Sequence, residues 1–563
     1  MMMEIEDEEY NKSELGGFLF AKESFIQKVF NTEFLSHLIA SFLDKNEKKL
    51  FYSANKKLNF FYKNSIKEIK SQIIIKSPEI VERFPNLKKL EVCGRKSVDF
   101  SFLKKKELKN LENLKLKEVT VRDTSLISGL TKLKTLNLIT NKINDISFVE
   151  NLKNLTILGI GNNKINDYSY LTNLRFLKSL SLQQCNLKDL EILNHDNFKY
   201  LEKLFIGNNP ISNYSFLHNL QNLNTLNLYH NNLKSIEFLL QLNTDKMIDL
   251  NIGENQISDY SPLLKFSNLI KLNLYNNKIK NLNFLIGNEL CFQNLEAIDL
   301  GSNQNIEELS TLNKMKKLKK INLFNCQLKN IDFLLKEDYQ SFEYIELAHN
   351  KAIDDYSIFS AFNNLKYLSL ETNIINNLNW LNNCQFGNSI IELNLGNIKI
   401  RNIYENLFNI YGYEEKKWTI SDFIEIFKNF TNLRIINLSN LELEDISFLK
   451  WNNFSHLEKI NLSFNQIRDA SPISSLKKLK NLNLKHNYIL DIMFLKEVLE
   501  IEELNLEGNS VKDFSVVLKL EKLEIINIKN QRSGLEREIN SEENKYFHDV
   551  IEEIKKKVTK CLI

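Results

Sequence analysis

The chain has 563 residues, of which 43% are hydrophobic and 26% are charged. This apolar fraction is too high for a disordered chain, and no run of about 18 apolar residues is present to span a membrane. Lys and Arg number 74 against 71 Asp and Glu, and a net charge of +3 indicates neither a nucleic-acid partner nor a membrane partner.

The two ends and the cysteines indicate a reducing compartment. The chain begins Met-Met-Met-Glu-Ile-Glu-Asp-Glu-Glu-Tyr, which is acidic where a secretory signal would be basic and then apolar. Its 6 cysteines form no C-x-x-C pair and no regular spacing, so they predict neither a disulfide framework nor a zinc site. We expect a cytoplasmic location and leave a nuclear one open.

One spacing recurs along most of the chain. Residues 133–154 read LKTLNLITNKINDISFVENLKN, and residues 155–176 read LTILGIGNNKINDYSYLTNLRF. The shared pattern L-x-x-L-x-L-x-x-N returns mostly every 22 to 24 residues, with weak first copies at Leu87 and Leu111 and a last copy at Leu523. A period of this length with this pattern is typical of a leucine-rich-repeat solenoid.

The repeat predicts an α/β solenoid, with a parallel sheet on the concave side and 3₁₀ or irregular turns on the convex side. Alternate side chains of a strand point to opposite faces, so the leucines of L-x-x-L-x-L point into one common core. No single turn buries its apolar face alone, and stability therefore comes from stacking. Helical caps are expected at both ends of the array.

The asparagine that follows each strand has a predicted structural task. Its amide can donate to and accept from backbone groups of adjacent turns that would otherwise be buried without partners. Cys185 and Cys326 occupy the same place in their repeats and are interpreted as structural. A second asparagine, four residues after the first leucine (Asn227 and Asn273, for example), we ascribe to repeat consensus and codon bias.

Composition and spacing divide the chain into parts. Residues 1–85 are expected to be helical, residues 86–535 to form the solenoid, and residues 536–563 to form a capping helix. The solenoid carries an insertion at about 402–430 that is rich in aromatic residues. The insertion is either a second binding element or a short helix packed over a convex turn.

Two helices are expected near the C-terminal end. Ser421 is a candidate cap for a helix in which Phe423, Ile424 and Phe427 share one face. The final helix has an apolar stripe that would cover the last open turn. The residues of that stripe are Phe547, Ile551, Ile554, Val558 and Leu562.

The concave strand positions supply candidate partner-binding residues. In the middle repeats, large aromatic and small side chains alternate from turn to turn, with acids and histidines among them. Tyr and Phe are suitable anchors because they bury a large area with few rotors. Duplication of a two-turn unit would produce the same alternation without a ligand. The candidates are Phe205, Tyr229, His230, Asp249, Glu254, Tyr275, Asp299, Phe324, Glu346, His349 and Glu371.

The repeat subclass resembles two families over residues 111 to about 530: bacterial internalins and the leucine-rich-repeat regulatory subunit of type-1 protein phosphatase. The resemblance implies a protein-binding concave face and, for the second family, a phosphatase catalytic subunit as partner.

Residues 25–62 resemble an F-box, a small helical bundle that docks a Skp-type adaptor. That resemblance implies that the repeats hold ubiquitination substrates; the alternative is a plain helical cap. The residues at matching apolar places, which would contact the adaptor, include Leu35, Leu38, Phe42, Leu43 and Leu50.

No motif indicates catalysis. The 8 histidines are scattered, and the sequence has no H-E-x-x-H, no Gly-rich phosphate loop and no G-x-S-x-G elbow. We expect no cofactor, no metal and no catalytic residue. The prediction is a monomeric, non-catalytic scaffold that binds a protein partner on its concave face, as the substrate-recognition adaptor of a ubiquitin ligase. A phosphatase regulatory subunit and an effector delivered into a host cell are the alternatives.

Overall fold

The computed structural model describes residues 68–70, 86–93, 100–104, 106–121, 123–285, 292–334, 341–400, 420–450, 454–532, 542–558 and 560–562. The chain divides into two compact units, Met1–Leu155 and Thr156–Ile563. Among the described residues, no helix is long and apolar enough to cross a membrane.

Unit 1 contains a parallel sheet whose strands follow the repeat. Ile69, Leu90, Leu114 and Leu136 stand in register across it. Its strands are β1 (Glu68–Lys70), β2 (Lys89–Cys93), β3 (Asn113–Lys117) and β4 (Thr135–Asn137). The 3₁₀ helices of this unit are Ser101–Lys104, Lys106–Asn110, Thr124–Ile127 and Ser147–Asn151.

Strand β1 differs from the prediction, because residues 68–70 lie in a region that was expected to be helical. Ile69 takes the register place of a repeat leucine beside Leu90, and β1 thereby pairs the edge of β2 that would otherwise be open. The five F-box candidates at residues 35–50 lie outside the described residues, and the F-box resemblance stays a prediction.

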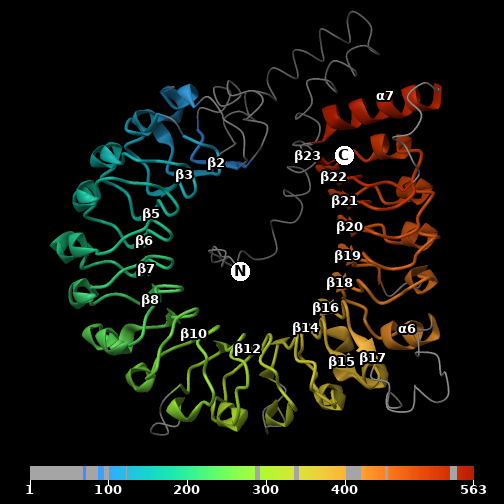
Figure 1. The fold of residues 1–563 in the computed structure, drawn as a ribbon. Coiled ribbons are helices and arrows are strands. Elements are labelled where there is room, and N and C mark those ends of the chain that lie inside the picture. The colour runs from blue at the N-terminus through green and yellow to red at the C-terminus, as the bar shows by residue number, and fades with distance from the viewer. Residues whose placement is uncertain are drawn as a thin grey trace, which may run out of the picture. The chain divides into compact units, whose positions relative to one another are not determined.

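Unit 2 is a longer run of the same repeat. Its strands line the inner side of an arc and the 3₁₀ helices lie on the outer side (Figure 1). Each strand is short and pairs in parallel with the strand of the next repeat. The strands are β5 (Ile157–Gly159), β6 (Ser179–Ser181), β7 (Lys203–Phe205), β8 (Thr225–Asn227), β9 (Asp249–Asn251), β10 (Lys271–Asn273), β11 (Ala297–Asp299), β12 (Lys320–Asn322), β13 (Tyr344–Glu346), β14 (Tyr367–Ser369), β16 (Glu392–Asn394), β18 (Ile435–Asn437), β19 (Lys459–Asn461), β20 (Asn481–Asn483), β21 (Glu503–Asn505), β22 (Ile525–Asn527) and β23 (Lys560–Leu562).

The 3₁₀ return segments confirm the predicted convex side. Many of them begin where an Asp side chain accepts the backbone N–H two residues on, as Asp259 does from Ser261 at 2.8 Å. In others an Asn takes the place of the Asp, as Asn213 does when it accepts the Ser215 N–H at 3.0 Å. These segments in unit 2 are Ser169–Asn173, Glu191–Asn194, Asp196–Phe198, Ser215–Asn219, Glu237–Gln241, Thr244–Lys246, Ser261–Lys265, Asn283–Leu285, Leu309–Lys314, Asp332–Leu334, Ser357–Ala361, Asn379–Asn383, Gln385–Asn388, Ser447–Lys450, Ser471–Ser475, Met493–Glu497 and Ser515–Lys519.

The core is the stacked leucine set that the period predicted. In the repeat that begins at Leu269, the side chains of Leu269, Leu272 and Leu274 are all buried. Leu250, Leu272 and Ile298 of three neighbouring strands stand in register, so each apolar side chain packs on its equivalent in the next turn. The sequence and the structure agree fully at this level.

The predicted asparagine ladder is present and buried. Asn255 Nδ2 donates to the carbonyl oxygens of Leu228 (3.1 Å), Ile252 (2.9 Å) and Gly253 (3.0 Å). Its Oδ1 accepts the backbone N–H groups of Asn231 (3.0 Å) and Leu233 (2.9 Å) in the preceding turn. One amide therefore satisfies backbone groups of two repeats.

The ladder tolerates other residues at a few places. The Cys326 thiol donates to the Leu300 carbonyl at 3.2 Å, and burial raises its pKa to about 12, which agrees with a structural role. Cys185 stands in the same place, and its N–H donates to Asn209 Oδ1 at 3.0 Å. Gln531 extends the ladder past the last asparagine by donating to the Leu506 carbonyl at 2.9 Å.

The insertion interrupts the period without interrupting the sheet. Leu393 of β16 stands in register with Ile436 of β18. A small side sheet, β15 (Ile374–Ile375) with β17 (Lys399–Ile400), precedes the insertion. Residues 401–419 lie outside the described residues.

The described end of the insertion is helix α6 (Ile420–Phe427), which packs on the convex side. Phe423 and Phe427 are buried as predicted, but the third buried residue is Ile426 rather than Ile424. The Phe423 ring stacks on Phe448 with centroids 5.2 Å apart. For α6 the interpretation as a helix packed over a convex turn is confirmed.

The C-terminal end combines a helix and a strand. Helix α7 (Glu542–Lys557) buries Ile551 and Ile554 and packs on the 3₁₀ helix Ser515–Lys519 of the last repeat. The helix was expected to reach Leu562, but the chain leaves it and adds strand β23 to the sheet. Cys561 thereby stands in register with Ile526, which covers the backbone edge that α7 alone would leave open.

We predict that Asn255→Leu lowers the free energy of unfolding by about 1 to 3 kcal/mol, because the Asn231 N–H, the Leu233 N–H and the Leu228 carbonyl lose a partner. The measurement is urea denaturation followed by circular dichroism. Gln256→Leu, which places a leucine at the exposed neighbouring position, is the control. Equal midpoints for the two variants would contradict the ladder's proposed energetic role.

Candidate functional site

The predicted partner-binding residues lie on the strands and strand ends of unit 2. We number the residues of each repeat from its first leucine, for example Leu223. The third and fifth residues lie in the strand and face the concave side, and the seventh and eighth follow as the backbone turns. The eighth residue has positive φ, as in His230 (φ 55) and Glu254 (φ 50). Side chains from neighbouring repeats therefore form rows across the concave face.

Acids and tyrosines gather along the concave face, and we call this group the acid–tyrosine stripe. Its members come from the repeats of β8 to β14 and lie at the strands or immediately after them. They are Tyr229, Glu254, Tyr275, Asp299, Tyr344, Glu346, Tyr367 and Glu371.

The first part of the stripe centres on Tyr229. Partial burial is the main cause that raises the pKa of its hydroxyl, and a hydrogen bond to the Glu254 carboxylate is the next. Tyr275 and Asp299 raise the same pKa through their charges, so these four side chains share one environment. Glu254 also holds His230, whose Nδ1 lies 2.8 Å from Glu254 Oε2.

The second part centres on Glu346. Its Oε2 accepts the Tyr367 hydroxyl at 2.7 Å, and the Tyr367 ring stacks on Tyr344 with centroids 4.0 Å apart and planes at 8°. Burial raises the pKa of Tyr344 to about 12, with further contributions from Glu346 and Asp299. The carboxylate of Asp299 thus links the two parts of the stripe.

Two of these carboxylates occupy a place that asparagine fills in most repeats. The fifth residue accepts the backbone N–H two residues on, as Asn227 Oδ1 does from Tyr229 at 3.0 Å. Asp299 does the same for Gly301 at 3.0 Å, and Glu346 for Ala348 at 2.8 Å. This local bond explains the concave asparagines, which sequence reasoning ascribed to consensus and codon bias.

The charge of Asp299 and Glu346 is therefore not needed for the turn. Burial raises the pKa of both carboxyl groups, which means that the ionised form is costly where it stands. Glu371 raises the pKa of Glu346 further through its own charge. Each carboxylate also has a side-chain partner, since Asp299 Oδ2 accepts Asn273 Nδ2 at 3.2 Å and Glu346 Oε2 accepts the Tyr367 hydroxyl. Carboxyl groups whose pKa is raised by burial are frequent at binding sites.

Lysines stand at the starts of some concave strands. The third residue is an exposed lysine in β7, β10 and β12, namely Lys203, Lys271 and Lys320. Asp249 takes the same place in β9; burial raises its pKa, and Lys271 and Lys203 oppose that shift. Lysines thus lie at the starts of β7, β10 and β12, while Asp299 and Glu346 lie at the ends of β11 and β13.

The glycines between the tyrosines have a packing cause that the sequence did not reveal. A Cβ at Gly253 would lie 2.6 Å from Asn273 Oδ1 and 3.2 Å from Tyr229 Cδ2. A Cβ at Gly301 would lie 2.9 Å from Tyr275 Cδ2. Each tyrosine ring thus leans over the glycine of the following repeat, and the alternation builds a flat aromatic surface.

The structure brings most predicted residues together, with some exceptions. Phe324 and His349 form a separate edge-to-face pair, with ring centroids 5.0 Å apart. Phe205 lies on β7, outside the repeats that form the stripe. Sequence reasoning missed Tyr344 and Tyr367, because the third position of the repeat was not compared across turns.

A shallow groove lies at the starts of strands β8 to β11. Elsewhere the second residue of each repeat is often charged and paired, as in Lys178–Glu202 (2.7 Å) and Lys366–Glu343 (3.0 Å). Between these pairs the same position holds Asn224, Ile248 and Ile270, and the Ile248 residue is 41% exposed. The groove has a volume of about 520 Å³.

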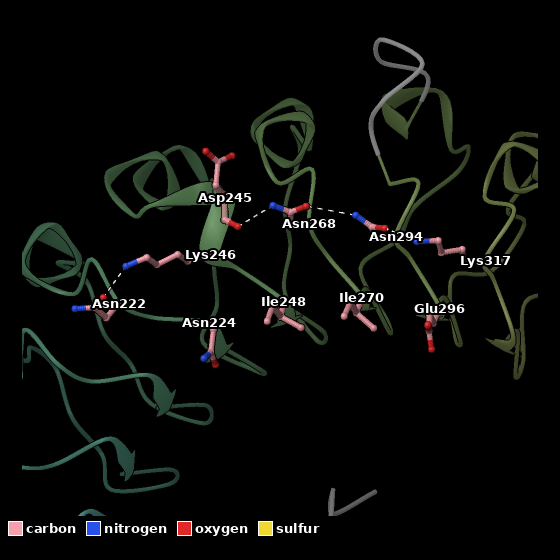
Figure 2. Close-up of a pocket in the computed structure, with 10 residues that line it drawn as sticks. All are labelled: Asn222, Asn224, Asp245, Lys246, Ile248, Asn268, Ile270, Asn294, Glu296 and Lys317. Carbon is pink, nitrogen blue, oxygen red and sulfur yellow. Dashed lines mark hydrogen bonds between the residues drawn. The ribbon is translucent and has the colours of Figure 1, made fainter.

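Asparagines form the wall of the groove (Figure 2). Lys246 Nζ donates to Asn222 Oδ1 at 2.6 Å, and Lys317 Nζ donates to Asn294 Oδ1 at 2.7 Å. Between them, Asn268 Nδ2 donates to the Asp245 carbonyl at 2.9 Å. The floor is apolar and the wall polar, a combination that suits one apolar side chain of a partner.

The described residues contain no group of three or more His, Cys, Asp or Glu side chains placed to hold a metal ion. Cys384 is buried, and burial raises its thiol pKa to about 12, so the thiolate is not formed at neutral pH.

The comparisons with known proteins match this fold. The family described as leucine-rich repeats in two copies matches residues 455–497. No curated protein matches the sequence. Stacked repeats of this kind create extended concave surfaces that such proteins use for binding.

Solved structures with similar folds include a leucine-rich-repeat protein of Leptospira interrogans at 22% identity, covering 82% of this chain and 99% of that one with a TM-score of 0.38. An internalin of Listeria monocytogenes is 21% identical and covers 38% of this chain and 83% of its own, with a TM-score of 0.32. A plant peptide hormone receptor in complex with its peptide is 19% identical over 80% of each chain, with a TM-score of 0.37. Similarity at this level extends none of their functions to this chain.

We predict that Asp299→Asn stabilises the protein at pH 7. Burial raises the pKa of Asp299 above its usual 3.8, so the folded chain binds this proton more tightly than the unfolded chain. The free energy of unfolding therefore falls as pH rises from that usual value through the raised one, and stays lower at neutral pH. Asparagine keeps the acceptor for Gly301 and removes the charge, although it gives up the second oxygen that accepts Asn273 Nδ2 at 3.2 Å.

The measurement is Tm between pH 3 and pH 8. The variant should melt above the wild type at pH 7, and the difference should shrink toward pH 3. Asp259→Asn is the control with opposite sign, since its hydrogen bonds to Ser261 lower the pKa of that exposed carboxyl. A lower Tm for Asp299→Asn at pH 7 would show that the carboxylate is structural.

Proposed function

We propose that this chain is an interaction scaffold whose acid–tyrosine stripe binds a partner protein that presents basic side chains. The observation that carries the proposal is the replacement of asparagine by Asp299 and Glu346 at a position where asparagine completes the turn. A Lys or Arg from the partner would offset the cost of the two partly buried charges. The neighbouring tyrosines supply apolar contact area around that ion pair.

The groove at the strand starts supports the same proposal. Asn224, Ile248 and Ile270 directly precede β8, β9 and β10, and the stripe begins at the other ends of these strands. Because each strand is only three residues long, a partner seated on the stripe also reaches the groove. The contact would then span both halves of the concave face.

The test of this proposal is recovery of partners from cells by affinity purification, quantified by mass spectrometry. In the full chain, Asp299→Asn with Glu346→Gln should reduce recovery of the main partner by about tenfold or more, because the partner's cation loses its counter-charges. Glu503→Gln, an exposed concave carboxylate on β21, is the matched control. Undiminished recovery with the double variant would contradict the role of the stripe.

We further propose that the bound protein is a ubiquitination substrate, with this chain as the adaptor of a ubiquitin ligase. This finer assignment depends on the resemblance of residues 25–62 to an F-box. One alternative is a regulatory subunit of a protein phosphatase, because the acids and aromatic residues of this concave face resemble the phosphatase-binding surface of that family. The other alternative is an effector delivered into a host cell. In each case the concave stripe is the partner-binding face.

A full-length variant with Leu38→Glu and Phe42→Glu separates these assignments. An adaptor should lose a Skp-type protein and its cullin with this variant and keep its concave-face partner. Recovery of a phosphatase catalytic subunit with both proteins would instead support the regulatory subunit. Thermal melting of the repeats must match the wild type, so that loss of binding is not loss of folding.

A further inference from the structure

A second surface departs from the repeat pattern near the C-terminal end of unit 2. In the repeats that begin at Leu457 and Leu479, three surface positions carry apolar residues: Phe464, Tyr488 and Leu490, which are 51%, 44% and 64% exposed. The neighbouring repeats hold polar residues or glycine at these places. The equivalents are Asn440 and Gly508, Gln466 and Ser510, and Arg468 and Lys512.

Phe464 is also in an unfavourable backbone conformation. It is the eighth residue of its repeat and has a φ of +58°. A bulky side chain is uncommon at positive φ, and the equivalent places in the adjacent repeats hold Asn440, His486 and Gly508. The fold does not require phenylalanine there, because the turn is made in every other repeat without it.

Two aromatic side chains of this surface, Phe464 and His486, are in contact. The Phe464 ring lies 4.8 Å from the His486 ring, measured between centroids. His486 in turn lies over Gly508, where a Cβ would collide with its ring. Tyr488 follows His486 by two residues, so the exposed apolar area continues from the strand ends toward Leu490.

Two arginines flank Tyr488. The guanidinium carbon of Arg532 lies 4.8 Å from the ring centroid, and that of Arg468 lies 5.8 Å from it. Within the described part of the chain neither arginine forms a salt bridge, whereas Lys485, 5.7 Å from the Phe464 ring, pairs with Glu507 at 3.1 Å. A guanidinium near a ring face still offers N–H groups to a carboxylate.

We propose that this surface, formed by Phe464, Arg468, His486, Tyr488, Leu490 and Arg532, binds a peptide segment of a partner protein in which carboxylate and aliphatic side chains alternate. The two unpaired arginines define the charge of the ligand, and the exposed leucine and aromatic rings define its apolar part. The surface lies on the repeats of β19 to β22, away from the stripe on β8 to β14. Its preferred ligand is acidic, whereas the stripe prefers a basic one.

A single-stranded nucleic acid fits this surface less well. Aromatic rings with arginine can stack bases, but such sites follow the backbone with a track of cations. Here the cations beside the rings are Arg468, Arg532 and Lys485, and Lys485 is already paired with Glu507, which is too few for such a track. Leu490 also offers no ring face for a base.

The test uses the full chain and fluorescence anisotropy with three short labelled probes: a Glu-Leu-Ser repeat peptide, its Lys-Leu-Ser counterpart and an oligouridylate. The acidic peptide should bind, and Arg468→Gln with Arg532→Gln should raise its Kd by about tenfold or more. Lys519→Gln, an exposed basic residue on the convex 3₁₀ helix Ser515–Lys519, should leave that Kd unchanged. The lysine peptide, if it binds the stripe, should be insensitive to the arginine variant.

Phe464→Asn gives a second and independent readout. The preceding repeat has an asparagine, Asn440, at this positive-φ position. The variant should therefore raise Tm and at the same time weaken binding of the acidic peptide. A lower Tm would show that Phe464 serves packing and would overturn its role in binding. Equal peptide affinity in the wild type and the arginine variant, no binding of the acidic peptide, or binding of the oligouridylate alone would overturn the proposal.

Discussion

The backbone turn after each strand is the constraint on which the rest of this structure depends. Every repeat must bring its chain inward directly behind a buried leucine, and this places N–H and C=O groups where water does not reach them. The asparagine ladder resolves this, because one amide such as that of Asn255 serves five backbone groups in two adjacent repeats. The leucine core can then stack without a cost in unpaired polar groups.

A second local bond sets the surface on which binding depends. The fifth residue of the repeat holds the N–H of the seventh, and the eighth takes positive φ. Once this bond needs only an oxygen, the position is free to vary between Asn, Asp and Glu. Asp299 and Glu346 use that freedom to place charge on the concave face, with the turn unchanged. The hydrogen bond between the fifth side chain and the seventh N–H therefore both makes the turn and positions the carboxylates of the site.

Departures from the repeat mark the two proposed surfaces in the same way. At the stripe, a carboxylate stands where an amide would be less costly. At the C-terminal surface, Phe464 stands at positive φ where asparagine would be less strained. Proteins keep such locally unfavourable choices at functional sites, while stability is supplied elsewhere. In a repeat array the comparison is direct, because the neighbouring turns show what the fold alone requires.

The sequence by itself determined the solenoid, the parallel sheet, the 3₁₀ return turns and the asparagine ladder. Each follows from a short-range rule repeated in register, and seventeen clear copies in the chain make that register readable. The position of β1, the strand β23 after α7, and the choice of Ile426 over Ile424 as a buried residue were decided only in three dimensions. These features depend on which sheet edge is open and which apolar side chains are uncovered in the folded chain, and the repeat period of the sequence does not predict either.

The site shows the same division. The rows of Tyr229, Tyr275, Asp299 and Glu346 were predictable because strand positions recur. The joining of Tyr344 and Tyr367 to Glu346 was not, since a stacked pair and a hydrogen bond between different turns depend on the spacing of the turns in space. The glycines beside the tyrosines read as gaps in the sequence. The structure shows them instead as the places over which the rings lie, because only a residue without Cβ lets a ring approach the backbone of the next turn.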